Sequence, residues 1–283
     1  MMEEIVTASW LNDRLQEEAD QFVLIDARYD LADSEAGKRV YEKGHLPGAV
    51  FLNLGKELAA PAKEHGGRHP MPEREQLEKV FGGAGISADK KVVIYDDQGG
   101  MMASRVWWML KHLGHRDAAI LDGGFTAWKE AGYEVTTDIS EPAARPFQAE
   151  QNSEDWPIVD VDYVKAALEN EDVLLIDSRE PKRYRGEEEP IDPVAGHIPG
   201  ALNYFWKEVL ADDGTWKKED ELKAHFAGLP SEKEIVVYCG SGISACPNVL
   251  ALKKAGFRNV KLYAGSWSDW ISYQDNPVAK GES

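Results

Sequence analysis

The chain has 283 residues, of which 43% are hydrophobic and 29% charged, as in ordinary globular proteins. Its 50 acidic and 32 basic side chains give a formal net charge of −18, and such a field repels phosphate, so we expect neither nucleic-acid nor membrane partners. The acidic N-terminus lacks the basic region of a targeting signal, no segment is apolar enough to span a membrane, and two cysteines provide no disulfide framework. We therefore predict a cytoplasmic protein with free thiols.

The first half of the chain alternates short apolar runs with helical stretches. Residues 23–25, 92–95 and 119–121 are too short for helices and rich in apolar or β-branched side chains, which predicts buried strands. Residues 106–113 have helical spacing and end at Gly114. Strands that alternate with helices predict an α/β fold with a parallel sheet flanked by helices.

The second half repeats motifs of the first half in the same order. The repeated pairs are residues 24–28 with 175–179, 44–49 with 196–201, 92–95 with 235–238, and 124–128 with 266–270. Order and near-constant spacing are not expected by chance, so we predict two tandem homologous domains, each of ordinary size. The predicted boundaries are 1–140 for the N-terminal domain, 141–157 for a proline-containing linker and 158–283 for the C-terminal domain.

The segment after Tyr238 is the strongest candidate for a functional site. In parallel α/β sheets, ligands bind beyond the carboxyl ends of the strands, and the strand at 235–238 leads into Cys-Gly-Ser-Gly-Ile-Ser-Ala at 239–245. Small residues let successive N–H groups converge on one point, and a helix expected near Pro247 adds partial positive charge, so we expect a reactive Cys239 thiolate. The substrate-binding residues predicted in this loop are Gly240, Gly242, Ile243, Ser244 and Ala245.

Three alternatives to a nucleophilic cysteine exist at this loop. A packing role, common for free cysteines, is expected for Cys246 but disfavoured for Cys239, which lies in a glycine-rich turn. Zinc would need a second cysteine pair or a nearby histidine, and neither is present, so we expect no metal or other cofactor. Cysteine phosphatases need an arginine six positions after the cysteine, where this chain has Ala245.

Four motifs together resemble those of tandem-domain rhodaneses, and especially of 3-mercaptopyruvate sulfurtransferases. They are the 239–245 loop, Gly-His-Leu/Ile-Pro-Gly-Ala at 44–49 and 196–201, Ser-Arg-Val-Trp-Trp-Met-Leu at 104–110, and Gly-Ser-Trp-Ser-Asp-Trp at 265–270. The resemblance covers nearly the whole chain. It implies an enzyme in which Cys239 takes sulfane sulfur from a small anionic donor, becomes a persulfide, and passes the sulfur to a thiol, a thioredoxin-like protein or cyanide.

The first domain has Asp96 at the position that Cys239 occupies in the second. A carboxylate cannot accept sulfane sulfur, so we expect the N-terminal domain to be catalytically silent. A non-enzymatic alternative stays open, in which the chain is a persulfide carrier or redox-sensing module that uses the same cysteine without turnover.

The resemblance also implies roles for residues away from the cysteine. Arg183 lies where the family keeps a substrate-binding arginine, and a guanidinium there would hold a carboxylate or sulfonate. A proton relay for mercaptopyruvate would use Ser241, His45 and Asp33, the last in preference to Asp30. The alternative for His45 is a structural role in the turn of its repeated motif.

Two departures from the family pattern bear on the donor. A second arginine is expected before the motif at 196–201, but residues 187–193 contain no basic side chain, which disfavours a keto acid. Thiosulfate-type loops usually have basic residues after the cysteine, and this chain has Gly240 and Ser241. On balance we favour 3-mercaptopyruvate over thiosulfate.

The segment His-Gly-Gly-Arg-His-Pro at 65–70 is the remaining concentration of histidines. Its glycines break helical geometry, so the two histidines do not share a helix face as a pair of metal ligands would. We interpret the segment as a solvated connector.

Overall fold

The computed structural model describes residues 2–149 and 155–282 and divides the chain into two compact units. Unit 1 contains Met1–Ala60, Pro72–Glu154 and Asp212–Trp216, and unit 2 contains Pro61–Met71, Asp155–Ala211 and Lys217–Ser283. Each unit therefore includes one short segment from the other half of the chain, which the predicted boundaries did not anticipate. The predicted linker at 141–157 includes residues 150–154, which lie outside the described residues.

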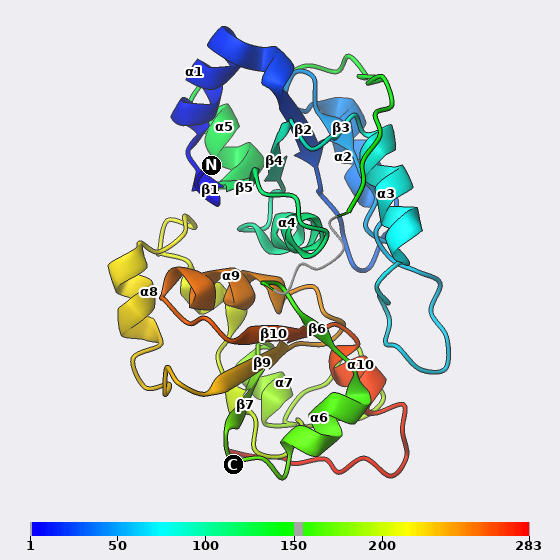
Figure 1. The fold of residues 1–283 in the computed structure, drawn as a ribbon, viewed down its shortest axis with the longest axis vertical. Coiled ribbons are helices and arrows are strands. Elements are labelled where there is room, and N and C mark those ends of the chain that lie inside the picture. Colours follow the sequence, from blue (N-terminus) through cyan, green and yellow to red (C-terminus); the bar gives the residue numbers. More distant parts are fainter. Residues whose placement is uncertain (1, 150–154, 283) are drawn as a thin grey trace. The chain divides into compact units, whose positions relative to one another are not determined.

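Unit 1 is a five-stranded parallel sheet in the order β1-β5-β4-β2-β3, with helices on both faces (Figure 1). Its strands are β1 (Ile5–Val6), β2 (Phe22–Asp26), β3 (Val50–Phe51), β4 (Lys91–Tyr95) and β5 (Ala118–Leu121). Its helices are α1 (Ala8–Glu18), the 3₁₀ turn η1 (Ala19–Gln21), α2 (Ala36–Lys43), α3 (Arg74–Gly83), α4 (Met101–His112) and α5 (Gly124–Glu130).

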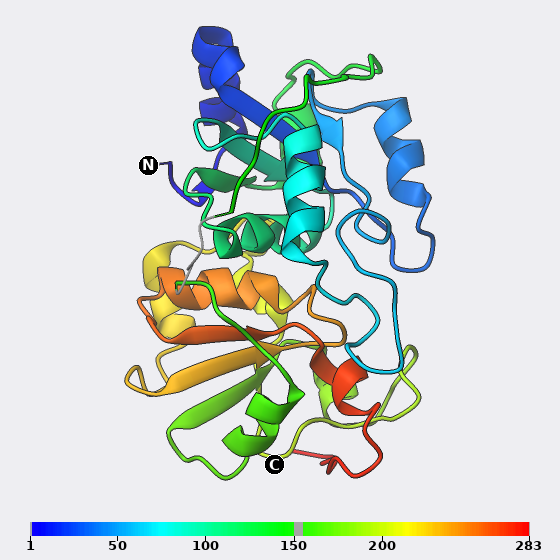
Figure 2. The same cartoon turned by 45° about the vertical axis from the view of Figure 1, so that its right-hand side comes forward.

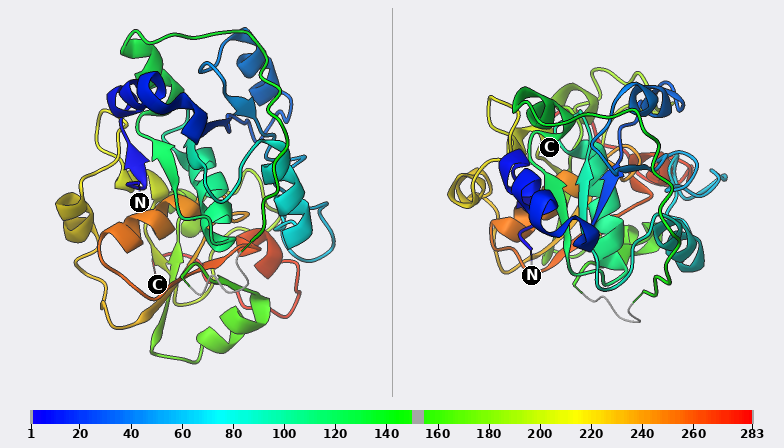
Figure 3. Two further views of the ribbon diagram at one scale, coloured as in Figure 1. Left: turned by 45° about the horizontal axis from the view of Figure 1, so that its top comes forward. Right: turned by 90° about the horizontal axis from the view of Figure 1, so that it is seen from above.

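The core of unit 1 forms because alternate strand residues point to opposite faces of the sheet. On one face, Leu24 and Val93 pack with Leu11 of α1 and Trp128 of α5. Helices α1 and α5 lie side by side there, as Figure 3 shows. Helix α4 contacts β4 and β5 and covers the other face.

Unit 2 repeats this architecture, with five parallel strands in the order β6-β10-β9-β7-β8. Its strands are β6 (Ile158–Val159), β7 (Val173–Asp177), β8 (Leu202–Asn203), β9 (Glu234–Tyr238) and β10 (Val260–Tyr263). Its helices are α6 (Val161–Ala167), α7 (Pro181–Tyr184), the 3₁₀ turn η2 (Trp206–Val209), α8 (Glu219–His225), α9 (Cys246–Lys254) and α10 (Ser266–Trp270).

The core of unit 2 has the same two-sided arrangement. Leu175 and Val236 pack with Val164 of α6 and Trp267 of α10 on one face. Helix α9 contacts β9 and β10 on the other face, and Figure 2 shows it lying alongside these strands. The tandem α/β architecture predicted from the internal repeat is thereby confirmed.

The predicted elements differ from the observed ones mainly at their ends. The helix predicted at 106–113 begins five residues earlier, at Met101. Residues 102–111 of this helix are all buried, so it has no polar face and its start carries no amphipathic signal. Helix α9 begins beside Pro247, as expected, because proline suits the first turn. None of the helices in the described part of the chain is both long and apolar enough to cross a bilayer.

Each unit has the same buried ion pair just after its second strand. The Arg28 Nη2 atom lies 2.6 Å from Asp26 Oδ2, and the Arg179 Nη2 atom lies 2.6 Å from Asp177 Oδ2. Each arginine also donates to the carbonyl of the glycine that precedes the repeated histidine, at 2.7 Å. The pairs hold that histidine motif against the sheet, which is a structural role.

Candidate active site

The loop at 239–245 connects β9 to α9 at the carboxyl end of the unit 2 sheet. Strand β9 lies between β7 and β10, so its end is at the middle of the sheet. Cys239 is the first residue after the strand and is buried. The nine-residue helix α9 follows directly, so its N-terminal N–H groups are oriented toward the loop.

Cys239 is fixed by hydrogen bonds at its sulfur and its backbone. The sulfur accepts the Gly242 N–H at 3.2 Å. The Cys239 N–H donates to Ser266 Oγ at 3.1 Å, and the Cys239 carbonyl accepts the Trp267 N–H at 2.9 Å. The start of α10 thus determines the position of the nucleophile.

Two residues beside the cysteine have left-handed backbone conformations. Ser266 has φ 57° and is the one non-glycine residue with positive φ in the ranges 2–149 and 155–282. Gly242 has φ 79°, and a Cβ there would lie 2.3 Å from the Ala264 carbonyl oxygen. Strain of this kind persists where the surroundings enforce it, and here it directs the Ser266 hydroxyl and the Gly242 N–H at Cys239. Sequence reasoning missed Ser266.

The segment 65–69 belongs to unit 2 and runs along α10. The Gly66 N–H donates to Asp269 Oδ1 at 2.7 Å, and the Arg68 N–H donates to Ser268 Oγ at 3.1 Å. The prediction of a solvated connector is therefore wrong. Because the segment is held against α10, its arginine and second histidine reach the cysteine loop.

Ser241 has a histidine at hydrogen-bond distance, and that histidine is His69. The His69 Nδ1 atom lies 2.9 Å from Ser241 Oγ. A hydroxyl paired with an imidazole can pass a proton to or from a bound molecule. The two residues are 172 positions apart, and no repeat or periodic pattern in the sequence connects them.

His45 has a structural environment in unit 1. Its Nδ1 lies 2.7 Å from the Tyr41 carbonyl oxygen, its Nε2 lies 3.1 Å from the Asp138 carbonyl oxygen, and its ring stacks on Tyr41. His197 in unit 2 has the same 2.7 Å contact and the same stacking with Tyr184. Since the repeated histidine has these contacts in both units, they favour the structural alternative for His45 over the proton relay.

Asp33 also differs from its predicted role. Its side chain is half-exposed and pairs with Arg39 at 2.5 Å. The hydrogen bond from Arg39 lowers the pKa of Asp33. Its partner is therefore an arginine on the surface of unit 1, and this contact does not orient a histidine.

Arg183 on α7 lies in a network of buried carboxylates. Its Nη2 atom donates to Glu189 at 2.7 Å and to Asp192 at 3.1 Å, and Asp192 also pairs with Arg68. Burial raises the pKa of Asp192, although the charge of Arg68 opposes this. Burial would also raise the pKa of Glu189, but the hydrogen bonds from Arg183 and from the backbone N–H groups of Asp192 and Ile191, together with the charge of Arg183, outweigh it, and the net pKa is lowered.

Both guanidinium groups approach the loop at Gly240. A Cβ at Gly240 would lie 3.0 Å from Arg68 Nη2 and 3.6 Å from Arg183 Nη2. A side chain here would displace the arginines, so the glycine leaves room for them next to the cysteine. Arg185, the weaker sequence candidate, instead pairs with the exposed Glu187 at 2.8 Å.

The rest of the predicted loop contributes backbone rather than side chains. Ile243 and Ala245 are buried, and Ser244 is partly exposed. The Ile243 carbonyl accepts the Cys246 N–H at 3.0 Å, and the Ala245 carbonyl accepts the Val249 N–H at 3.1 Å, so these residues lead into α9.

Unit 1 has an anion in the equivalent loop, namely the carboxylate of Asp96. Its Oδ1 accepts the N–H groups of Gln98 and Gly100, each at 2.9 Å. Its Oδ2 accepts those of Met102 at 2.8 Å and Ala103 at 3.0 Å. Burial raises the pKa of Asp96, and the four N–H groups oppose this. The four corresponding positions in unit 2 are Ser241, Ile243, Ala245 and Cys246.

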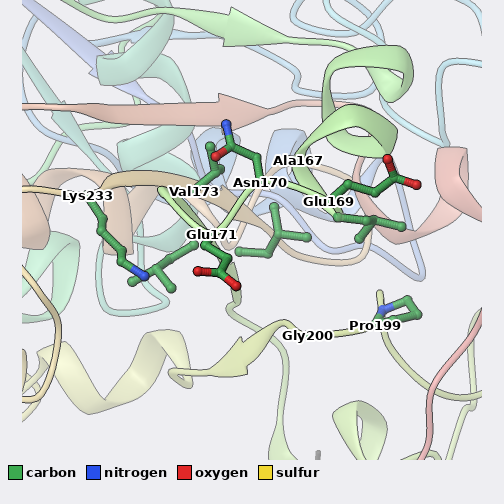
Figure 4. A pocket seen from close by; sticks show the side chains of 11 residues that line it. Ala167, Glu169, Asn170, Glu171, Val173, Pro199, Gly200 and Lys233 are labelled. Atoms are coloured by element: carbon green, nitrogen blue, oxygen red, sulfur yellow. The ribbon is translucent and has the colours of Figure 1, made fainter.

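A separate surface pocket of about 450 Å³ lies on unit 2 (Figure 4). Its polar lining includes Glu169, Asn170, Glu171 and Lys233. The pocket also includes the first residues of β7, whereas Cys239 follows the carboxyl end of β9, so the two lie at opposite ends of parallel strands. None of the predicted site residues lines it.

Comparison with known proteins identifies the family of this chain. The rhodanese-like domain family matches residues 7–131 and 160–273. A probable 3-mercaptopyruvate sulfurtransferase of Pseudomonas aeruginosa is 41% identical over 99% of both chains. A putative thiosulfate sulfurtransferase, SseB of Mycobacterium tuberculosis, is 38% identical over 98% of this chain and 97% of its own length. The crystal structure of SseA from Escherichia coli, described among 3-mercaptopyruvate sulfotransferases, has 32% identity and a TM-score of 0.82, and the match covers 94% of this chain and all of that one.

The family match covers both halves of the chain, and the named relatives match almost all of it. The sulfurtransferase function expected from the motifs is thereby confirmed, and the carrier without turnover is not favoured. The chain therefore belongs to the rhodanese family.

Proposed function

We propose that this chain transfers sulfane sulfur from 3-mercaptopyruvate to a thiol through a persulfide on Cys239. The observation that carries the proposal is the convergence on one loop of a cysteine, a serine–histidine pair and two guanidinium groups. In the first step the Cys239 thiolate attacks the donor sulfur, and the carbon–sulfur bond of the donor breaks. Pyruvate leaves as its enolate, and the proton of the donor thiol is transferred to that carbon.

The second step returns the cysteine to its starting state. An acceptor thiolate attacks the outer sulfur of the persulfide, and the sulfur–sulfur bond breaks to release the Cys239 thiolate. A small thiol, a thioredoxin-like protein or cyanide would serve as acceptor. Because the cycle begins and ends with a free thiolate, it suits a reducing compartment such as the cytoplasm.

The backbone of the loop supports a negatively charged persulfide. In unit 1 the N–H groups at the equivalent sequence positions hold the Asp96 carboxylate. In unit 2 the Cys239 sulfur accepts the Gly242 N–H, and the outer sulfur would take the place of the carboxylate oxygens. By the same comparison, unit 1 is catalytically silent because its anion is a carboxylate.

Arg68 and Arg183 would bind the carboxylate of the donor. No described residue accepts a hydrogen bond from Nη2 of Arg68 or Nη1 of Arg183. Both atoms lie beside Gly240, since a Cβ there would be 3.0 and 3.7 Å from them. Arg68 thus supplies the second arginine that the sequence lacks at 187–193, which favours a keto-acid donor.

The pairing of Ser241 with His69 also favours 3-mercaptopyruvate. Loss of sulfur from this donor leaves an enolate that needs a proton, and a hydroxyl–imidazole pair can carry that proton from the donor thiol. Thiosulfate leaves as sulfite and needs no proton at the sulfur-transfer step, so a relay would contribute nothing to it.

Steady-state kinetics with both donors tests the proposal. We expect kcat/KM for 3-mercaptopyruvate to exceed that for thiosulfate, and Arg68→Met and Arg183→Met each to raise KM for 3-mercaptopyruvate about tenfold or more, as for a lost charge-assisted hydrogen bond. Arg185→Met is the matched control, because this arginine pairs with exposed Glu187. A wild-type preference for thiosulfate would overturn the assignment of the donor.

A further inference from the structure

Unit 2 is longer than unit 1 between the stacked tyrosine and the repeated histidine. Tyr184 precedes His197 by 13 residues, whereas Tyr41 precedes His45 by four, so unit 2 has nine additional residues here. Both ring pairs nevertheless stack with centroids 3.8 Å apart. The extra length is therefore accommodated without change to the repeated motif, and it contains two buried carboxylates.

These carboxylates are Glu189 and Asp192, with side chains 4% and 2% exposed. Glu189 pairs with Arg179 at 3.3 Å and with Arg183 at 2.7 Å. Asp192 pairs with Arg183 at 3.1 Å and with Arg68. Together with the ion pair after β7, they form a chain of alternating charges. Its members in order are Asp177, Arg179, Glu189, Arg183, Asp192 and Arg68.

The donor-binding arginines therefore belong to an ion-pair chain with no net charge. Three guanidinium groups are balanced by three carboxylates, and burial of the carboxylates limits screening by salt. A donor with one negative charge can take the remaining N–H groups of Arg68 and Arg183. A second negative charge on the donor would face Asp192 at short range without a cation to balance it.

We propose that Asp192, supported by Glu189, makes this site selective for sulfur donors with one negative charge over donors with two. The inference rests on the proposed function, in which Cys239 accepts sulfur from a donor held by Arg68 and Arg183. 3-Mercaptopyruvate has one charge at neutral pH, on its carboxylate, and thiosulfate has two. The nine-residue extension of unit 2 is then a determinant of donor choice.

Two donors that share chemistry but differ in charge isolate this effect. Thiosulfate and methanethiosulfonate both give their outer sulfur to a thiolate, and they leave as sulfite and methanesulfinate respectively. Thiosulfate is a dianion and methanethiosulfonate a monoanion. With cyanide as acceptor, we expect the wild-type kcat/KM to be about tenfold or more higher for methanethiosulfonate.

The variant Asp192→Asn keeps the size of the side chain and removes its charge. We expect it to raise the ratio of kcat/KM for thiosulfate to that for methanethiosulfonate by roughly 10- to 100-fold. Glu189→Gln should raise the same ratio less, since Arg179 shares that carboxylate. Glu188→Gln is the matched control on the same segment, because its carboxylate is exposed and pairs with Lys182, and it should leave the ratio unchanged.

Selectivity separates this inference from a structural role and from the proposed function. An equal fall of both kcat/KM values in folded Asp192→Asn would overturn the inference. If Asp192→Asn does not fold, the test rests on Glu189→Gln and on the wild-type kcat/KM values for thiosulfate and methanethiosulfonate. A wild-type preference for thiosulfate would then overturn the inference. Mass spectrometry of wild-type Cys239 tests the function separately. If wild-type Cys239 gains about 32 Da, one sulfur atom, but the Asp192→Asn variant keeps the wild-type donor selectivity, only the inference is wrong. If no donor produces a gain, the proposed function fails.

Discussion

The loops after β4 and β9 have related backbones but hold different anionic groups. In unit 1, Asp96 satisfies four N–H groups with its own two oxygens. In unit 2, the single sulfur of Cys239 accepts the Gly242 N–H, and of the four equivalent N–H groups that of Cys246 donates to the Ile243 carbonyl at 3.0 Å. The comparison teaches that the same strand–loop–helix element can hold a buried carboxylate of its own, as in unit 1, or a buried cysteine, as in unit 2.

The surroundings of the two loops differ as well. At the positions of Gly240 and Ser241, unit 1 has Asp97 and Gln98. The Gln98 amide donates to the Tyr29 carbonyl at 2.5 Å, so this side chain is used within unit 1. In unit 2, the glycine leaves room for guanidinium groups and the serine pairs with a histidine.

Gly242→Ala should break the unit 2 loop most severely. A Cβ at this left-handed position would lie 2.3 Å from the Ala264 carbonyl oxygen, so the loop must move and its N–H groups lose their alignment. We expect kcat/KM to fall by more than about 10²-fold, since displacements near 1 Å have that effect. Steady-state assays check this, with Gly83→Ala of unit 1 as control, because a Cβ there meets no atom within 4 Å. Activity within a few-fold of wild type would mean that the loop tolerates displacement.

His69→Gln and His45→Gln sharpen the comparison between the units. His69 pairs with Ser241, so its loss should lower kcat with 3-mercaptopyruvate about 10²-fold and thiosulfate turnover much less. His45 is buried against backbone carbonyls, so its variant should lower stability and leave the pH dependence of kcat unchanged. Parallel kcat–pH profiles for both donors provide the check. The reverse pattern, with His45→Gln altering the profile, would restore the assignment made from sequence.

Asp96→Asn should destabilise unit 1 with little effect on catalysis. The amide has one acceptor oxygen where the carboxylate has two, so buried N–H groups lose partners and the free energy of unfolding should fall by roughly 2–4 kcal/mol. We expect kcat/KM to change by less than about twofold, because the proposed chemistry uses side chains of unit 2 only. Asp97→Asn is the control, since Asp97 is exposed. Thermal unfolding and steady-state kinetics of the Asp96→Asn variant, measured together, test this prediction. A large loss of kcat in a folded variant would contradict the proposal that unit 1 is catalytically silent.

Local motifs carried most of what could be predicted from the sequence. The internal repeat predicted two sheets, and the change from Asp96 to Cys239 within it favoured one loop as the candidate reactive site. A strand end, a glycine-rich loop and the start of a helix are contiguous in the chain, so their arrangement follows from sequence order.

Contacts between distant segments could not be predicted in this way. Arg68 and His69 reach the loop because segment 65–69 is held along α10, and no periodicity encodes such a return. The left-handed conformation of Ser266 had one signal in the sequence, because the repeat aligns Ser266 with Gly124. The φ angles of the two residues are 57° and 56° respectively. A glycine in one copy can thus mark a strained position in the other.

Mass spectrometry of the protein after treatment with 3-mercaptopyruvate tests the central claim most directly. We predict a gain of about 32 Da, confined to the peptide that contains Cys239 and removed by a thiol acceptor. Cys239→Ser should show no gain, and the double variant Asp96→Cys/Cys239→Ser should show none either, because unit 1 lacks the surroundings of the unit 2 loop. A persulfide that persists in Cys239→Ser, on Cys246 or on the introduced cysteine, would contradict the account.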